Sequence, residues 1–214
     1  VNTRSLFFWD DVDNLMSTAP SGIGASKYSL SYWFYPVANS PSSNPMVSIG
    51  NDAQTYQYGR LMVYPSATNI RAYVATGAGA YTIITGPPWT LGVWNHVVIT
   101  DDSDSSAAGT VTIYVNGVTT GGTPATGRQF TGTAADQKMI WNKRVSYLNY
   151  GTPQTYLNDV ALWDEVISAS NVTAIYNSGT AIDVTDISGV PAPVSYWQTG
   201  NGVGDTTSVI KDQI

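Results

Sequence analysis

Cysteine is absent from this 214-residue sequence, and histidine occurs once, at position 96. Without cysteine the chain has no disulfides, thiolate zinc sites or cysteine nucleophiles. A single histidine also excludes a multi-histidine metal site. No run of about 18 apolar residues is present, so we expect no membrane insertion. The first residues lack a basic segment followed by an apolar run, so we expect no signal peptide.

Charge is also scarce. Asp, Glu, Lys and Arg make up 11% of the chain, against about 25% in an ordinary domain. The surface must therefore consist largely of hydroxyl, amide, glycine and tyrosine groups, which suits an extracellular protein or one exposed on a virion. The net charge is −6, and only Lys143 and Arg144 are adjacent basic residues. Nucleic-acid binding depends on clustered Lys and Arg, so we expect no nucleic-acid partner.

What the sequence does contain is a series of short β-prone runs separated by Gly, Pro, Asn and Asp. In one of them Val111, Ile113 and Val115 alternate with polar residues, which places one face in a core. Asn116-Gly117 then supplies the positive φ angles of a tight hairpin. The pattern predicts an all-β fold, either a sandwich or a barrel. The expected strands are 28–35, 45–49, 58–64, 69–74, 81–84, 93–100 and 109–115.

One segment, near 168–177, has helical spacing. Ser168 is a suitable N-cap, Val172, Ile175 and Tyr176 share one face, and Gly179 is a stop signal. We expect one short helix there. No break in composition divides the chain, so residues 1–214 are interpreted as a single domain.

Three segments carry a resemblance to a known family. They are a Trp-x-His-Val strand at 93–100 followed by a Tyr-Val-Asn-Gly strand end at 109–117, a closing pattern at 157–163 with 168–179, and an aspartate-rich stretch at 9–15. The chain resembles the concanavalin A-like lectin/glucanase superfamily and its laminin G-like, pentraxin-like domains. The resemblance implies an all-β, two-sheet antiparallel jelly-roll sandwich, places His96 in a core strand beside Trp94, and gives Asp159 the role of a structural anchor.

The C-terminal segment, 190–214, departs from the usual order of the family. Family members usually open with a strand carrying an aromatic-Trp-x-x-Gly pattern, and here that pattern occurs at Tyr196 to Gly200. We expect this segment to supply the permuted first strand, or else to pair with a neighbouring copy. The layout looks like modules of structural proteins from marine tailed phages.

The resemblance includes glycosidases, which place paired carboxylates in a cleft. The only adjacent acids late in the chain are Asp164 and Glu165, and neighbouring residues of a strand face opposite ways. His96 has no candidate serine or acid partner nearby in the sequence, so a structural histidine is the better interpretation. We therefore expect no catalytic residues and no enzyme.

Calcium is the one cofactor that the sequence suggests. Asp101, Asp102 and Asp104 lie in an oxygen-rich hairpin loop, and Asn51-Asp52 forms another candidate. Calcium takes six to eight oxygen ligands. The alternative is that these loops are solvated turns, since Asp and Asn favour turns through local hydrogen bonds.

Carbohydrate binding would need exposed aromatic rings beside polar groups. Candidates are Tyr56 and Tyr58, which lie close to Asn51-Asp52, together with Tyr81 and Trp89. The alternative is that the large aromatics pack the core, as we expect for Trp33, Trp94 and Trp163 and, as a second interpretation, for Trp89.

Two functions remain open. The first is a non-catalytic structural or decoration module exposed on a virus particle, which contacts other virion proteins or copies of itself, with adhesion to host surface glycans as a further role. The alternative is a calcium-assisted, lectin-like carbohydrate-binding module of a secreted or adhesion protein.

Overall fold

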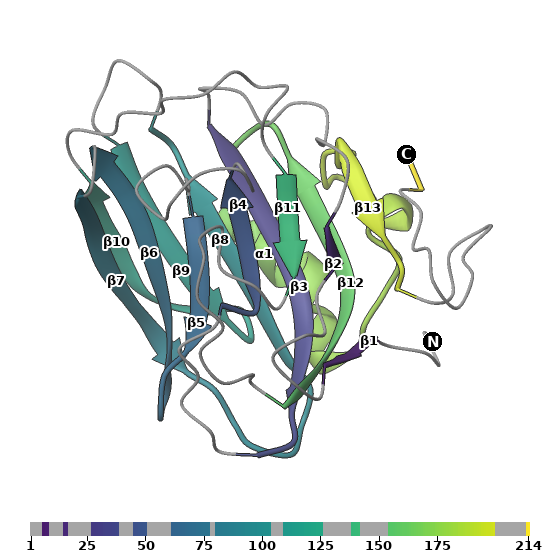
Figure 1. Ribbon diagram of the computed structural model, residues 1–214. Helices are drawn as coiled ribbons and strands as arrows, with labels where there is room; N and C mark the ends of the chain where they lie inside the picture. The colour runs from purple at the N-terminus through teal and green to yellow at the C-terminus, as the bar shows by residue number, and fades with distance from the viewer. Residues whose placement is uncertain are drawn as a thin grey trace.

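The computed structural model is a sandwich of two antiparallel β-sheets with one short α-helix outside it (Figure 1). It describes residues 6–8, 15–16, 27–38, 45–50, 61–77, 80–103, 109–125, 138–141, 154–199 and 213–214. The predicted all-β, two-sheet sandwich with one short helix is therefore confirmed.

Sheet A has seven strands, with the main order β1-β12-β3-β8-β9-β10 and with β13 also paired to β12. Its strands are β1 (Leu6–Phe8), β3 (Tyr28–Pro36), β8 (Asn95–Asp101), β9 (Gly109–Val115), β10 (Val118–Ala125), β12 (Thr155–Trp163) and β13 (Ser195–Trp197).

Sheet B has six strands in the order β2-β11-β4-β5-β6-β7. Its strands are β2 (Leu15–Met16), β4 (Val47–Gly50), β5 (Leu61–Pro65), β6 (Asn69–Gly77), β7 (Ala80–Pro88) and β11 (Lys138–Trp141). The strands from β4 to β7 follow one another as a meander, which antiparallel strands with short connections allow.

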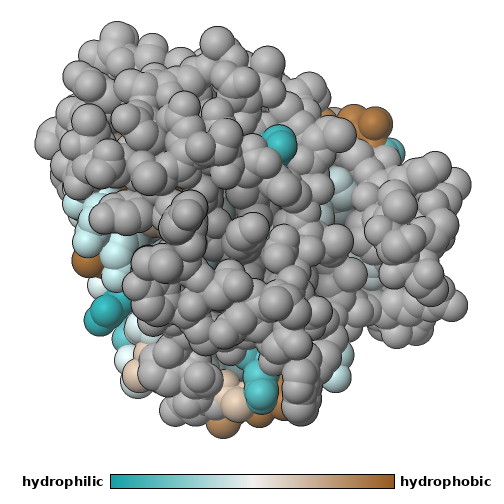
Figure 2. All heavy atoms as spheres, viewed as in Figure 1, coloured by the Kyte–Doolittle hydropathy of each residue, from teal (hydrophilic) through white to brown (hydrophobic). Residues whose placement is uncertain are grey.

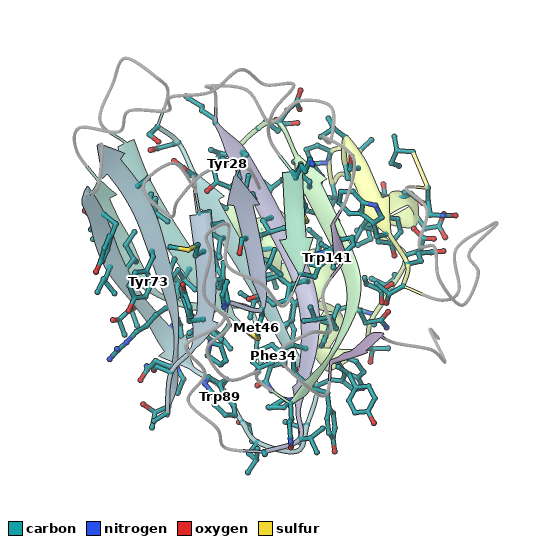
Figure 3. The ribbon with its side chains drawn as sticks, in the orientation of Figure 1. Tyr28, Phe34, Met46, Tyr73, Trp89 and Trp141 are labelled. Atoms are coloured by element: carbon teal, nitrogen blue, oxygen red, sulfur yellow. The ribbon has the colours of Figure 1, made fainter. Side chains whose placement is uncertain are left out.

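The main core lies between the two sheets and follows the period-two pattern of the sequence. Val111, Ile113 and Val115 of β9 face it, while the residues between them are only partly buried. Aromatic rings fill much of the space, with the rings of Trp141 and Trp197 in edge contact at 5.4 Å between centroids. Figure 3 shows Phe34, Met46 and Trp141 between the layers.

The predicted hairpin turn is present between β9 and β10. Asn116 and Gly117 have φ angles of 52° and 76°, as a two-residue hairpin of this type requires. A Cβ atom on Gly117 would also lie 3.1 Å from the ring of Tyr176. Both the turn conformation and this close approach therefore favour glycine.

The helix α1 (Ala169–Tyr176) covers the outer face of sheet A. Ser168 is its N-cap, as predicted, and accepts a hydrogen bond from the Asn171 amide. The helix ends earlier than the Gly179 signal suggests, because Asn177 adopts the left-handed conformation directly after Tyr176. Two 3-10 helices follow, η3 (Asn177–Gly179) and η4 (Val184–Asp186).

A second apolar cluster lies under α1. Val172 and Ile175 of the helix pack with Trp163 of β12 and Tyr196 of β13. Among the described residues, no helix is long and apolar enough to cross a membrane.

The C-terminal segment adds the strand β13 to sheet A, where it pairs with β12 of the same chain. β1 pairs with residues 155–157 of β12, and β13 pairs with residues 160–162 along the same edge. Tyr196 and Trp197 are 1% and 4% exposed, and the Gln213 amide donates to the Tyr196 carbonyl at 2.8 Å. Whether β13 takes the place of the family's first strand stays a prediction.

Candidate functional site

The outer face of sheet B carries a row of tyrosines. In β5, β6 and β7 the core-facing residues include Val63, Ala72 and Ile84, so by period two their neighbours face outward. The outward set is Met62, Tyr64, Arg71, Tyr73, Ala75, Tyr81, Ile83 and Thr85.

Tyr64, Tyr73 and Tyr81 form a diagonal across these three strands, which we call the tyrosine stripe. Tyr64 and Tyr73 meet edge to face with 4.8 Å between ring centroids, and Tyr73 and Tyr81 lie 5.2 Å apart at an interplanar angle of 42°. Diagonal neighbours on paired strands are within reach of aromatic side chains. Figure 3 shows Tyr73 over β6.

Exposure increases along the tyrosine stripe. Tyr64 is 5% exposed and its hydroxyl donates to the Met62 sulfur, Tyr73 is half-buried, and Tyr81 is 49% exposed beside Ile83 at 46%. The stripe therefore runs from a fixed inner ring to an open outer ring. Such a surface can stack against the face of a ligand ring while its hydroxyls form hydrogen bonds.

Charge is distributed unevenly between the two sheets. The strands of sheet B contain Arg71 and Lys138 and no acidic residue, whereas those of sheet A contain Asp101 and Asp159 and no Lys or Arg. Arg71 is exposed and lies directly across from Tyr64. In a chain of net charge −6, the tyrosine stripe thus lies next to a guanidinium that can bind a carboxylate or phosphate in bidentate fashion.

The structure places two of the four predicted glycan-contact residues. Tyr81 lies in the tyrosine stripe, whereas Trp89 follows the far end of β7 and packs against the core. The Trp89 indole N–H donates to the Ser66 carbonyl at 3.0 Å, and its ring meets Phe34 edge to face. Tyr56 and Tyr58 lie outside the described residues.

The sequence missed Tyr64 and Tyr73 as partners of Tyr81. The period-two pattern predicts which face of its own strand each tyrosine occupies. It does not predict the register between neighbouring strands, and that register brings the three rings together. The Ala75–Tyr81 pair and the register shift beside it set this arrangement. The signal that was available is the recurrence of tyrosine at outward positions of consecutive β-prone runs.

The acidic hairpin loop is partly described. Asp101 is fully buried, and its Oδ1 accepts hydrogen bonds from the Ser103 amide at 3.0 Å and the Ser103 hydroxyl at 2.6 Å. Asp102 is exposed and its Oδ1 accepts from the Thr110 amide. Both carboxylates thus accept hydrogen bonds from described residues next to them, at the end of β8 and the start of β9.

These two aspartates do not by themselves form a cation site. In the part of the chain that the structure describes, no three His, Cys, Asp or Glu residues come together. Asp104, Asn51 and Asp52 lie outside the described residues, so calcium binding by the full set stays a prediction.

His96 is a structural residue of β8. It is 1% exposed, and its Nε2 lies 2.7 Å from the Ser31 hydroxyl. Its ring contacts the tilted ring of Trp33, with 4.8 Å between centroids, and stacks with Tyr176 at 6.1 Å. Burial lowers the pKa of His96 to about 3, so the ring is neutral at ordinary pH.

The adjacent acids Asp164 and Glu165 lie in the bend after β12 and are exposed. The Glu165 carbonyl accepts a hydrogen bond from the Ser29 hydroxyl at 2.7 Å. The hydrogen bond between Ser29 and Glu165 fixes the connection between β12 and α1.

The prediction that Trp94 belongs to the core is wrong. Trp33 and Trp163 are 3% and 0% exposed, but Trp94 is 39% exposed. Period two correctly places Trp94 on the same outer side of sheet A as His96, where Tyr176 covers His96. Trp94 lies beyond this cover, at the end of the strand, and its ring contacts Tyr35 at 5.7 Å.

Comparison with known proteins adds the family. A model described as the concanavalin A-like lectin/glucanases superfamily (Laminin_G_3) matches residues 10–173, more than half of the chain. Comparison with curated proteins finds no match.

Solved structures show the same fold at low identity. The botulinum neurotoxin type G receptor-binding domain is 12% identical with a TM-score of 0.56, over 84% of this chain and 46% of that one. The receptor-binding domain of the botulinum neurotoxin C/D mosaic serotype is 13% identical with a TM-score of 0.56, over 82% and 42%. This chain therefore spans less than half of those domains.

A third similar structure is matched over most of its length. The native heptameric SAP-like pentraxin from Limulus polyphemus is 16% identical with a TM-score of 0.51, over 82% of this chain and 87% of that one.

Proposed function

Because the chain belongs to the concanavalin A-like lectin/glucanases superfamily, we propose that it is a non-catalytic module that binds carbohydrate through the outer face of sheet B. The tyrosine stripe is the observation that supports this proposal. It combines an exposed ring at Tyr81 and a half-buried ring at Tyr73 with an inner ring, Tyr64, that fixes their position.

The geometry suits a saccharide. A sugar ring has an apolar C–H face and a polar edge, and a tilted pair of tyrosines offers a surface for the first and hydroxyls for the second. Rigid aromatic side chains also lose little conformational entropy on binding. Arg71, beside the tyrosine stripe, adds a contact for an acidic substituent.

This proposal does not require calcium. The strands of sheet B contain no acidic residue, so a ligand can bind the tyrosine stripe through stacking, hydroxyls and Arg71 alone. Calcium-assisted binding would instead use the predicted loops at 101–104 and 51–52. Chelation therefore separates the two forms of carbohydrate binding.

A glycan array with matched variants tests the proposal. Wild type is compared with a Tyr73→Ser/Tyr81→Ser variant and with Tyr156→Ser, a control that truncates a half-buried tyrosine on sheet A. We expect binding that the double variant loses at least tenfold and that the control retains. Binding that survives in the double variant would contradict the role of the stripe.

A decoration module on a virus particle is the second candidate. It is favoured by the weakly charged composition, with 11% charged residues, and by the exposed apolar side chains of Leu91, Val93 and Trp94 between β7 and β8, which suit protein contact. In that role the module contacts other virion proteins or copies of itself, on the virion surface. An array without any binding, obtained with folded protein, would favour it.

A further inference from the structure

The last two strands of sheet B, β6 and β7, present cross-strand pairs on the face turned away from the core. These pairs are Arg71 with Thr85, Tyr73 with Ile83, and Ala75 with Tyr81. We call this set of residues the β6–β7 track. Figure 2 shows hydrophilic and hydrophobic groups next to one another at the left edge of the view, where β6 and β7 lie in Figure 1.

The β6–β7 track coincides with the regular part of the ladder between these strands. The register shifts on both sides of it, between Asn69 and Arg71 and between Ala75 and Gly77, and is continuous in between. Successive residues on one face of a strand lie about 6.8 Å apart, so the first and last pairs of the track are separated by about 14 Å. A ligand that contacts both ends must therefore be longer than one sugar ring.

The chemistry of the side chains changes along the track. Arg71 and Thr85, at one end, are both exposed and polar. In the middle, the half-buried ring of Tyr73 lies across from Ile83, which is 46% exposed. At the far end Tyr81 is 49% exposed, and its partner Ala75 is too small to stand over the ring. The order along the track is thus charged, then apolar, then aromatic.

The tyrosine stripe and the β6–β7 track share Tyr73 and Tyr81, whose ring centroids lie 5.2 Å apart. Both surfaces for stacking a sugar ring are therefore in the middle and at the far end of the track. Arg71 lies at the other end, next to Tyr73 on the same face of β6. Ring contacts and charge are separated along one line, which gives a bound chain of sugars a direction.

Arg71 determines which ligands suit the charged end. Among the described residues, none forms a hydrogen bond or an ion pair with its guanidinium. A guanidinium binds a carboxylate, or a phosphate-like oxyanion such as sulfate, through two parallel hydrogen bonds. The exposed hydroxyl of Thr85, across from Arg71, can donate a further hydrogen bond to the same group.

Contacts with sheet A and with β6 hold β7 in place, although it is an edge strand. A Cβ atom on Gly86 would lie 2.5 Å from Cγ2 of Ile113, so the β7 backbone packs directly on β9. The Thr120 hydroxyl donates to the Thr85 carbonyl at 3.4 Å, and Nδ2 of Asn69 donates to the Gly86 carbonyl at 2.9 Å. Because the strand is already fixed, a ligand loses little affinity to ordering it.

From this arrangement we propose that the β6–β7 track binds an oligosaccharide that carries an anionic group, a carboxylate or a sulfate. The anionic group lies at Arg71, and neighbouring sugar rings lie on Tyr73 and Tyr81. This inference rests on the proposed function and adds to it the charge, the minimum length and the direction of the ligand. A neutral oligosaccharide makes the ring contacts alone, so it binds more weakly than an acidic one.

Binding measurements with matched oligosaccharides test the ligand class. The probes are uronate-containing and sulfated tetrasaccharides, each paired with its carboxyl-reduced or desulfated form. We expect wild type to bind an acidic probe at least tenfold more tightly than its neutral form. The affinity for the acidic probe should fall as salt is added, because salt screens exposed charges. The pair with the larger difference identifies the anionic group as a carboxylate or a sulfate.

Variants of the two basic residues on the strands of sheet B locate the contact. Arg71→Gln should weaken binding of the acidic probe at least tenfold and leave the neutral form unchanged. Arg71→Lys keeps the charge without the planar fork and should recover part of the loss. The control Lys138→Gln changes the net charge equally but lies on β11, three strands away from β6, and should bind like wild type. Circular dichroism checks that each variant is folded.

The possible results separate this inference from the proposed function. Equal affinity for acidic and neutral probes, with binding still lost in Tyr73→Ser/Tyr81→Ser, would overturn the inference and leave the proposed function standing. An acidic preference that Lys138→Gln weakens as much as Arg71→Gln would also overturn it, since overall charge would then be the cause. A single uronic acid bound as tightly as the tetrasaccharide would overturn the stated length. No binding of any probe by folded protein would overturn the proposed function and this inference together.

Discussion

The Tyr196 hydroxyl donates a hydrogen bond to Oδ1 of Asp159 across 3.2 Å, and both side chains are buried. Asp159 lies where the register between β12 and β3 shifts, and its φ is +46°. The irregular part of β12 is therefore tied to the C-terminal strand. Thr199 continues the connection by donating to the Asn158 side chain at 2.5 Å.

Removing this hydrogen bond should destabilise the protein. Tyr196→Phe keeps the ring and deletes the donor to a buried carboxylate, at a cost of about 1–3 kcal/mol. Urea unfolding measures the change. Asp159→Asn is a suitable partner for a double-mutant cycle, because asparagine tolerates a positive φ. Additive effects of the two substitutions would show that the contact contributes nothing.

The same tyrosine predicts a loss of stability at alkaline pH. Burial, reinforced by the negative charge of Asp159, raises the pKa of Tyr196 well above its usual value of 10. The folded state then holds a proton that the unfolded state releases, so stability falls as pH rises above 10. Unfolding free energies measured between pH 8 and 11 should fall less steeply for Tyr196→Phe than for wild type. Equal slopes for the two proteins would contradict this assignment. The slope that remains in Tyr196→Phe is expected to come from buried Tyr32, whose pKa is also raised.

The buried imidazole of His96 should make the protein lose stability in acid. Burial lowers its pKa to about 3, so between that value and the unfolded value near 6.5 the unfolded state binds the extra proton. Stability is present in full above pH 6.5 and is lost as pH falls, by roughly 4–5 kcal/mol at most, since one pKa unit corresponds to about 1.4 kcal/mol. Chemical denaturation at pH 7, 5 and 4 should show a shallower decline for His96→Gln. An unchanged decline would assign acid sensitivity to other groups.

Two tryptophans of contrasting burial test the packing. Trp197→Ala opens a cavity against Trp141 in the core and should cost about 3–5 kcal/mol. Trp94→Ala removes an exposed ring and should cost no more than about 1 kcal/mol. Thermal unfolding at low protein concentration compares them. Equal losses of stability would show that Trp94 contributes as much as a core residue, which would contradict its 39% exposure.

The C-terminal segment allows a test by circular permutation. A chain that begins with residues 190–214 and runs through a flexible linker into Val1 should fold and unfold cooperatively, because β13 and β1 lie along the same edge of β12. Deletion of residues 194–214 removes Tyr196 and Trp197 from the two clusters and should unfold the domain. A permutant that cannot fold would contradict the permuted-strand hypothesis.

Local patterns determined much of the fold. The alternation at Val111 to Val115, the Asn116-Gly117 turn and the Ser168 cap each depend on a few neighbouring residues, and each is confirmed. The end of α1 differs because Asn177 adopts the left-handed conformation before Gly179 is reached.

The candidate site depends on relationships that a single sequence does not contain. Tyr73 and Tyr81 meet through the register of β6 and β7, and nothing local specifies that register. Trp94 and His96 share one side of β8, yet α1 covers only the second. The position at which a helix ends over a sheet depends on tertiary packing. The sequence pattern therefore could not predict that His96 is buried and Trp94 exposed.

The most direct test of the central proposal is a glycan array of the purified protein, run once with calcium and once with a chelator. We expect binding that is equal in both conditions and that the Tyr73→Ser/Tyr81→Ser variant loses. Binding that requires calcium would contradict the tyrosine stripe and move the site to the loops at 101–104 and 51–52. No binding in either condition, with the domain folded, would contradict carbohydrate binding altogether.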